Sequence, residues 1–115
     1  MSFATSEVEN DVLNGGFHQY FWNTSGALAE EAVAGFRLIG ANAHAALLER
    51  AIQMAQAEAT WMRPFRELGT VAAFADSATQ SALSALDSEF YRLSDDLCAF
   101  RIAYIRAHPD EFVTN

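Results

Sequence analysis

The stretch Asp11-Val-Leu-Asn-Gly-Gly-Phe-His-Gln-Tyr-Phe-Trp-Asn-Thr-Ser-Gly26 decides the fold of this chain. It combines three glycines, three side-chain amides and four aromatic rings in sixteen residues. Asparagine and glycine enter the left-handed backbone region at low cost, and many helices end in this way. We therefore expect a short helix from about Glu7 to Leu13, which residues 14–16 (Asn-Gly-Gly) end.

The residues after the glycines predict a second short helix. Phe17, Tyr20 and Phe21 have the i, i+3, i+4 spacing of one helical face. Gln19 and Asn23 lie one turn apart, and we expect their amides to bond backbone groups freed at the bend. A glycine-rich phosphate cradle is disfavoured, because the stretch lacks a Lys or Arg and no strand precedes it. The stretch is interpreted as a rigid helical corner, buried under an aromatic plug.

Apolar residues recur at helical spacing through the rest of the chain, and no segment shows the sustained period-two alternation of a strand. Residues 24–26 (Thr-Ser-Gly) supply a turn and a cap. The pattern predicts an all-α, compact single-domain bundle of five or six helices over residues 1–115. Beyond the corner, we expect helices over about 27–40, 42–57, 64–74 (with Pro64 in its first turn), 83–93 and 94–108, with a polar turn at 76–80.

The composition is that of a folded protein without a membrane segment. Hydrophobic residues make up 51% of the chain, which is enough for a core. No apolar run approaches the roughly 20 residues that span a bilayer, and the first residues do not resemble a secretory signal. Cys98 is the sole cysteine and lies in an apolar helical pattern, so we expect it in the core. These features favour a cytoplasmic protein without a membrane partner.

The charge balance is strongly acidic. Fifteen acidic residues face seven basic residues, which gives a net charge of -8, and every basic residue is an arginine. Such a chain repels nucleic acid and anionic membranes and attracts basic partners. The alternative is that this charge only keeps a small protein soluble.

The sequence contains no motif that indicates catalysis or metal binding. His18, His44 and His108 lie far apart, and none forms a helical metal pair with a second ligand. Cys98 has no CxxC partner, and the serines lack a nucleophile-elbow motif. We therefore predict structural or exposed histidines, no catalytic residue, no metal, no cofactor and no enzymatic activity.

The corner stretch resembles the signature of a bacterial helical family of unknown function that includes a DNA-mimic protein. Softer similarity extends over about residues 7–112, and the chain looks short at its N-terminus, since family members commonly carry another helix before the signature. The resemblance implies a compact all-helical fold in which the signature residues are structural. The matching positions are Asp11, Asn14-Gly15-Gly16-Phe17, Gln19-Tyr20-Phe21 and Asn23-Thr24-Ser25-Gly26.

For the DNA-mimic member, the resemblance implies an acidic surface that occupies the DNA-binding face of a regulator. The expected partner is a basic DNA-binding or nucleic-acid-processing protein, with no direct binding of nucleic acid. Arg92, Arg101 and Arg106 lie near the C-terminal acids and are candidates to neutralise part of them. Glu9 is expected to turn away from its neighbours. The candidate partner-binding carboxylates are Glu7, Asp11, Glu30, Glu31, Asp87, Glu89, Asp95 and Asp96.

Two other functional classes remain open at this point. An immunity or antitoxin protein would use the same acidic surface to neutralise a basic toxin. A small-ligand protein or an enzyme would need a concave pocket with converging polar groups, and a deep pocket around His18, Gln19 and Tyr20 would favour this class. A homodimer that aligns two acidic faces is also left open.

Overall fold

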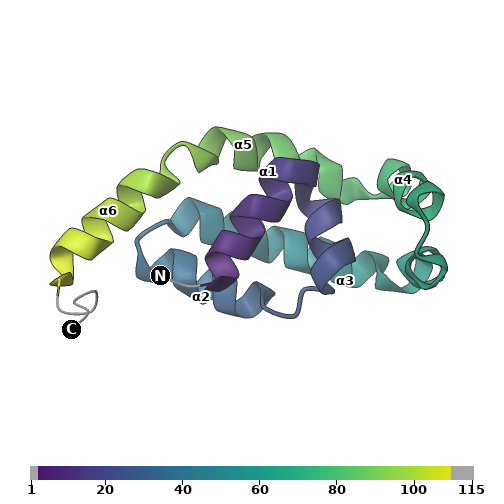
Figure 1. Ribbon diagram of the computed structural model, residues 1–115, viewed down its shortest axis with the longest axis horizontal. Helices are drawn as coiled ribbons and strands as arrows, with labels where there is room; N and C mark the ends of the chain where they lie inside the picture. Colours follow the sequence, from purple (N-terminus) through teal and green to yellow (C-terminus); the bar gives the residue numbers. More distant parts are fainter. Residues whose placement is uncertain (1–2, 110–115) are drawn as a thin grey trace.

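The computed structural model describes residues 3–109, and every regular element among them is a helix (Figure 1). The predicted all-α single-domain bundle is confirmed. Within the described range, no helix is both long enough and apolar enough to cross a bilayer. The elements are α1 (Phe3–Thr24), α2 (Ala29–Leu38), α3 (Asn42–Leu68), α4 (Val71–Gln80), the 3-10 helix η1 (Ala82–Leu86), α5 (Asp87–Ser94) and α6 (Leu97–Ala107).

Helix α1 bends sharply at Gly16, whose backbone has φ 85° and ψ 177°. The two short helices predicted on either side of the glycines are therefore the two arms of α1. We call residues 14–17 the Gly16 corner. Gly16 and Phe17 are buried as expected, but Asn14 and Gly15 are exposed and keep helical backbone angles. The expectation of a wholly buried corner was wrong for these two residues, because only Gly16 turns the chain.

Helices α2 and α3 form the helical hairpin expected from the sequence, and the first arm of α1 lies across them (Figure 1). Gly40, with φ 84°, lies in their short connection. The apolar stripes of the two helices face each other and the second arm of α1, because burying them removes the most apolar surface from water. The fully buried side chains at this centre include Phe17, Tyr20, Phe36, Leu47 and Leu48.

The predicted helix boundaries between residues 57 and 80 were wrong. Helix α3 continues through Pro64 to Leu68, and it ends at Gly69 in the left-handed conformation with φ 64°. Helix α4 then begins behind Thr70, whose side chain accepts a hydrogen bond from the Ala73 N–H. The predicted polar turn at 76–80 lies inside α4. Hydroxyl groups there bond to backbone carbonyls one turn earlier, as Ser77 does to Phe74, so these polar residues fit within a helix.

The C-terminal third changes from a packed segment to a projecting one. The segment predicted as one helix over 83–93 is divided between η1 and α5. Helix α6 extends past the end of the α2–α3 hairpin (Figure 1), and Leu97 is its only buried residue. Cys98 is exposed, so the expectation that it lies in the core was wrong. It lies on a helix that runs beyond the core.

Candidate functional site

The Gly16 corner is fixed by one of the predicted surface acids. The backbone N–H of Phe17, freed by the bend, donates to Oδ1 of Asp87 at 2.9 Å. A Cβ atom on Gly16 would lie 2.2 Å from Oδ2 of the same carboxylate. Burial raises the pKa of Asp87, and the Phe17 hydrogen bond partly opposes that shift. Asp87 therefore has the role that was predicted for the amides of Gln19 and Asn23, which make no hydrogen bond to another described residue.

The aromatic plug is confirmed, and two predicted acids lie beside it. Phe17 and Tyr20 are fully buried, and the Phe17 ring meets Phe90 edge-to-face with centroids 5.6 Å apart. Burial and then the charge of Glu7 raise the pKa of Tyr20 to about 12, with a smaller contribution from Asp11. Glu7 and Asp11 thus act on the same hydroxyl, as expected for neighbours one turn apart.

Of the remaining predicted acids, most are exposed and one, Glu89, is paired with an arginine. The exposed group consists of two neighbouring pairs, one in the first turn of α2 and one between α5 and α6, and none of its members forms an ion pair within the described chain. Glu89 instead meets Arg50 of α3 at 3.0 Å. Four of the predicted acids are therefore exposed: Glu30, Glu31, Asp95 and Asp96.

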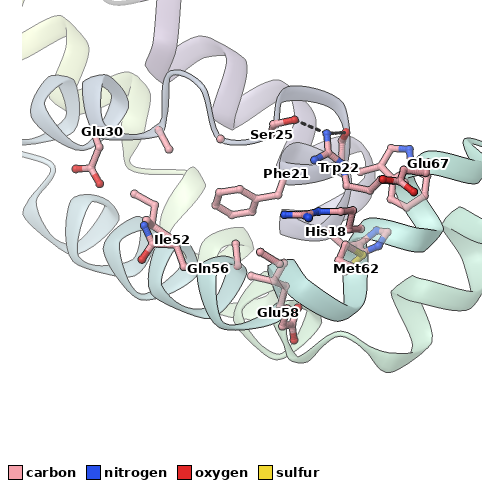
Figure 2. A pocket seen from close by; sticks show the side chains of 17 residues that line it. His18, Phe21, Trp22, Ser25, Glu30, Ile52, Gln56, Glu58, Met62 and Glu67 are labelled. Carbon is pink, nitrogen blue, oxygen red and sulfur yellow. Dashed lines mark hydrogen bonds between the residues drawn. The ribbon is translucent and has the colours of Figure 1, made fainter.

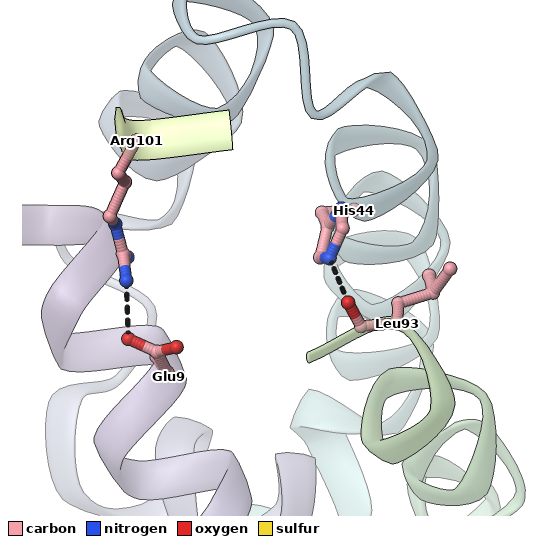
Figure 3. Close-up of polar contacts among 4 residues, drawn as sticks. All are labelled: Glu9, His44, Leu93 and Arg101. Carbon is pink, nitrogen blue, oxygen red and sulfur yellow. Dashed lines mark hydrogen bonds and ion pairs between the residues drawn. The ribbon is translucent and has the colours of Figure 1, made fainter. Parts of the chain in front are cut away.

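Two polar contacts hold the α5–α6 junction, which we define as residues 93–97 (Figure 3). The Nε2–H of buried His44 donates to the Leu93 carbonyl at 2.7 Å. Arg101 meets Glu9 at 2.7 Å, so Glu9 does turn away from the other α1 acids. Burial lowers the pKa of His44, while the Leu93 bond and the Asp96 charge oppose that shift. Arg101, one of the arginines expected to neutralise the C-terminal acids, pairs instead with Glu9 of α1.

His18 is also held in one tautomer by its contacts. The Ser77 hydroxyl donates to the Phe74 carbonyl, so its oxygen accepts the Nε2–H of His18 at 2.8 Å. Burial lowers the pKa of His18, and the charge of Glu58 partly opposes this. His18 and His44 are therefore structural, as predicted. Within residues 3–109, no group of three or more His, Cys, Asp or Glu side chains is placed to hold a metal ion.

A pocket of about 540 Å³ opens between the second arm of α1, the start of α2, and α3 (Figure 2). His18 lines it, but Gln19 does not, and Tyr20 lies in the core. The pocket expected for a small-ligand protein thus exists, although its walls differ from those expected from the sequence. Its polar side chains come mainly from α3.

Residues 1–108 match the model of the family described as DMP19-like protein. The chain belongs to this family. DMP19 denotes DNA mimic protein 19, so the resemblance seen in the corner stretch is confirmed. The chain matches no curated protein and no solved structure. The family description refers to DNA mimicry and states no catalytic activity.

In this DMP19-like protein, the corner residues of the signature and the exposed acids lie on different segments. Gly16, Phe17 and Tyr20 build the corner, whereas the exposed acids lie on other segments. Sequence reasoning missed the corner role of Asp87 and the ion pair between Glu9 and Arg101. Their partners lie 70 and 92 residues away along the chain, so no local spacing could have revealed either contact.

Proposed function

We propose that this protein is a DNA mimic that binds a basic DNA-binding or nucleic-acid-processing protein on its DNA-binding surface. Membership of the DMP19-like family carries the proposal. The net charge of -8 and the exposed carboxylates that no arginine neutralises support it. The role is binding in the cytoplasm, not catalysis.

The proposed contact surface consists of carboxylate pairs. A DNA strand presents one phosphate per about 3.4 Å of axis, and side chains one helical turn apart have Cβ atoms about 5–6 Å apart. Glu7 and Asp11, which lie one turn apart on α1, can therefore imitate part of a phosphate row. Asp87 and Glu89 contribute less than the other predicted acids, because the Phe17 N–H and Arg50 already engage them. The main contributors are Glu7, Asp11, Glu30, Glu31, Asp95 and Asp96.

The test is capture of the partner followed by competition with duplex DNA. The full-length protein is immobilised, a binding protein is isolated from a lysate of the source cells, and duplex DNA is added to the complex. We expect the DNA to displace the partner, and the association rate to fall steeply with salt, because exposed charges are screened within about 8 Å at physiological ionic strength. A partner that binds the protein and DNA together, or that binds equally well at high salt, would overturn the proposal.

A charge-matched pair of variants separates a local surface from net charge. Asp95→Asn/Asp96→Asn and Glu67→Gln/Asp76→Asn each remove two exposed acids. We expect the first double variant to reduce the association rate severalfold, and the second to reduce it much less. Equal reductions would indicate that the association rate depends only on the net charge of the protein and not on the position of the acids.

The identity and stoichiometry of the captured complex address the remaining alternatives. A toxic nuclease whose activity this protein suppresses would favour the immunity or antitoxin role over regulation of a DNA-binding protein. Light scattering of the free protein and of the complex measures whether two copies align their acidic surfaces.

A further inference from the structure

The pocket beside the second arm of α1 has the dimensions of a small-molecule site. Its volume of about 540 Å³ falls within the range of roughly 300–1,000 Å³ that is usual for such sites. Of the acids proposed for DNA mimicry, only Glu30 lines it, so the mimicry does not use its apolar walls or its arginines. The inference below therefore goes beyond the proposed function.

The walls of the pocket are mainly apolar. Figure 2 shows the Phe21 ring projecting from α1 toward Ile52 and Gln56 of α3, with Met62 nearer to His18. Small side chains on α3 line the space between these larger ones and keep it open. An apolar body of one or two rings would be removed from water there, at a gain of about 25 cal/mol per Å². The larger apolar lining residues are Phe21, Trp22, Ile52, Met62 and Leu83.

Two guanidinium groups on α3 supply the positive charge of the pocket. Arg63 and Arg66 lie three residues apart, so they share one side of the helix. Neither forms an ion pair with another described residue. Arg66 donates to the Trp22 carbonyl at 3.3 Å and to the Ser25 hydroxyl, which ties it to the end of α1 and leaves other N–H donors free. Guanidinium groups bind carboxylates through paired hydrogen bonds.

The acids of the pocket limit the charge of a ligand. Both oxygens of Glu58 are occupied, one by the Ser81 hydroxyl at 2.6 Å and one by the Ala82 N–H at 2.7 Å. Glu30 and Glu67 lie at opposite ends of the pocket (Figure 2). A second anionic group placed toward either end would therefore be repelled, which favours a ligand with one negative charge.

We propose that this pocket binds a small apolar molecule that carries a single carboxylate. The apolar body lies against Phe21, Ile52 and Met62, and the carboxylate meets Arg63 and Arg66. The proposal rests on the volume, the apolar walls and the two arginines without ion pairs, and it would stand even if the protein bound no DNA-binding partner.

The test uses 2-naphthoate as the probe, with 2-naphthamide as a neutral analogue of the same size. Calorimetry on the full chain measures both affinities, and amide chemical shifts locate the site. We expect 2-naphthoate to bind at least about tenfold more tightly than the amide, with the largest shifts around Gln56, Ala59 and Met62. Equal binding of the two probes, binding of neither, or shifts centred elsewhere would overturn the proposal.

Three variants test the named groups. Arg63 is exposed and makes no hydrogen bond to another described side chain, so Arg63→Gln should fold normally and bind 2-naphthoate about tenfold more weakly. Arg92→Gln removes an equal charge from α5 and should bind unchanged. Ala59→Leu places a larger side chain in the pocket from an exposed position and should weaken the binding of both probes. Unchanged affinity in Arg63→Gln, or equal losses in Arg63→Gln and Arg92→Gln, would exclude the proposed carboxylate contact.

Discussion

The Gly16 corner and the α5–α6 junction are both held by a side chain that bonds to a distant backbone group. Asp87 accepts the Phe17 N–H across 70 residues, and His44 donates to the Leu93 carbonyl across 49. They differ in what surrounds them. Fully buried aromatic side chains pack against the corner, whereas the helix that follows the junction buries only Leu97.

This difference indicates that a long-range hydrogen bond stabilises a segment in proportion to the packing around it. At the corner, a broken bond would leave buried polar groups without partners, which costs about 1–3 kcal/mol for each group. At the junction, the Arg101–Glu9 pair is partly exposed, so water can replace much of what that contact provides. We therefore expect damage at the corner to unfold the whole domain, and damage at the junction to free α6 alone.

The largest expected effect is at Gly16. Gly16→Val should destabilise the protein by about 3 kcal/mol or more, because φ 85° strains any side chain and the new Cβ would overlap Asp87. Gly15→Ala is the matched control. Its Cβ would meet only the side chain of Gln19, whose amide lies nearest and can move, and its backbone is helical, so a change within about 1 kcal/mol is expected. Urea unfolding measures both, and similar losses would show that the bend is not the strained element.

Removing the partner of the corner should have the next largest effect. Asp87→Ala leaves the Phe17 N–H without an acceptor and should cost about 1–3 kcal/mol. Asp87→Asn keeps an acceptor oxygen and should cost less. Chemical denaturation compares the two, and equal losses would mean that the carboxylate charge, not the hydrogen bond, holds the corner.

At the junction, a smaller and more local effect is expected. The Arg101–Glu9 side chains are 16% and 23% exposed, so solvent partly screens the pair. Arg101→Gln should cost about 1 kcal/mol or less in global stability, while amide exchange should accelerate in α6 and remain slow in α3. Acceleration of both helices to the same extent would contradict the view that α6 opens separately.

The pH dependence of stability should be the mildest of these effects. Burial lowers the pKa of folded His44 below the ordinary value of 6.5, so the unfolded chain takes up the proton first as pH falls. The contribution of neutral His44 to the free energy of unfolding is complete above about pH 6.5. It is lost as the pH falls toward the pKa of His44 in the folded protein. His44→Gln should flatten the decline in melting temperature between pH 7 and 5, and exposed His108→Gln should not. His18, whose pKa is lowered in the same direction, should contribute to the remaining slope.

The parts of the fold that follow local rules could be predicted from sequence. The bend at Gly16, the α2–α3 hairpin and the buried Tyr20 follow from glycine placement and helical spacing. The course of α3 through Pro64 could not, because a proline removes one N–H donor and usually ends or kinks a helix, whereas this helix continues to Leu68. The candidate site was harder to predict. Whether a carboxylate is exposed or bonded depends on which cation or N–H group the fold brings close to it.

Helix α6 has one further consequence, for the electric field of the molecule. Arg106 lies ten residues beyond Asp96, which along a helix of 1.5 Å per residue corresponds to about 15 Å. That separation exceeds the screening length of about 8 Å at physiological ionic strength. The helix thus acts as a spacer that keeps Arg106 apart from the acidic pair Asp95 and Asp96 at the α5–α6 junction. A partner approaching the junction would meet a negative potential that Arg106 hardly reduces.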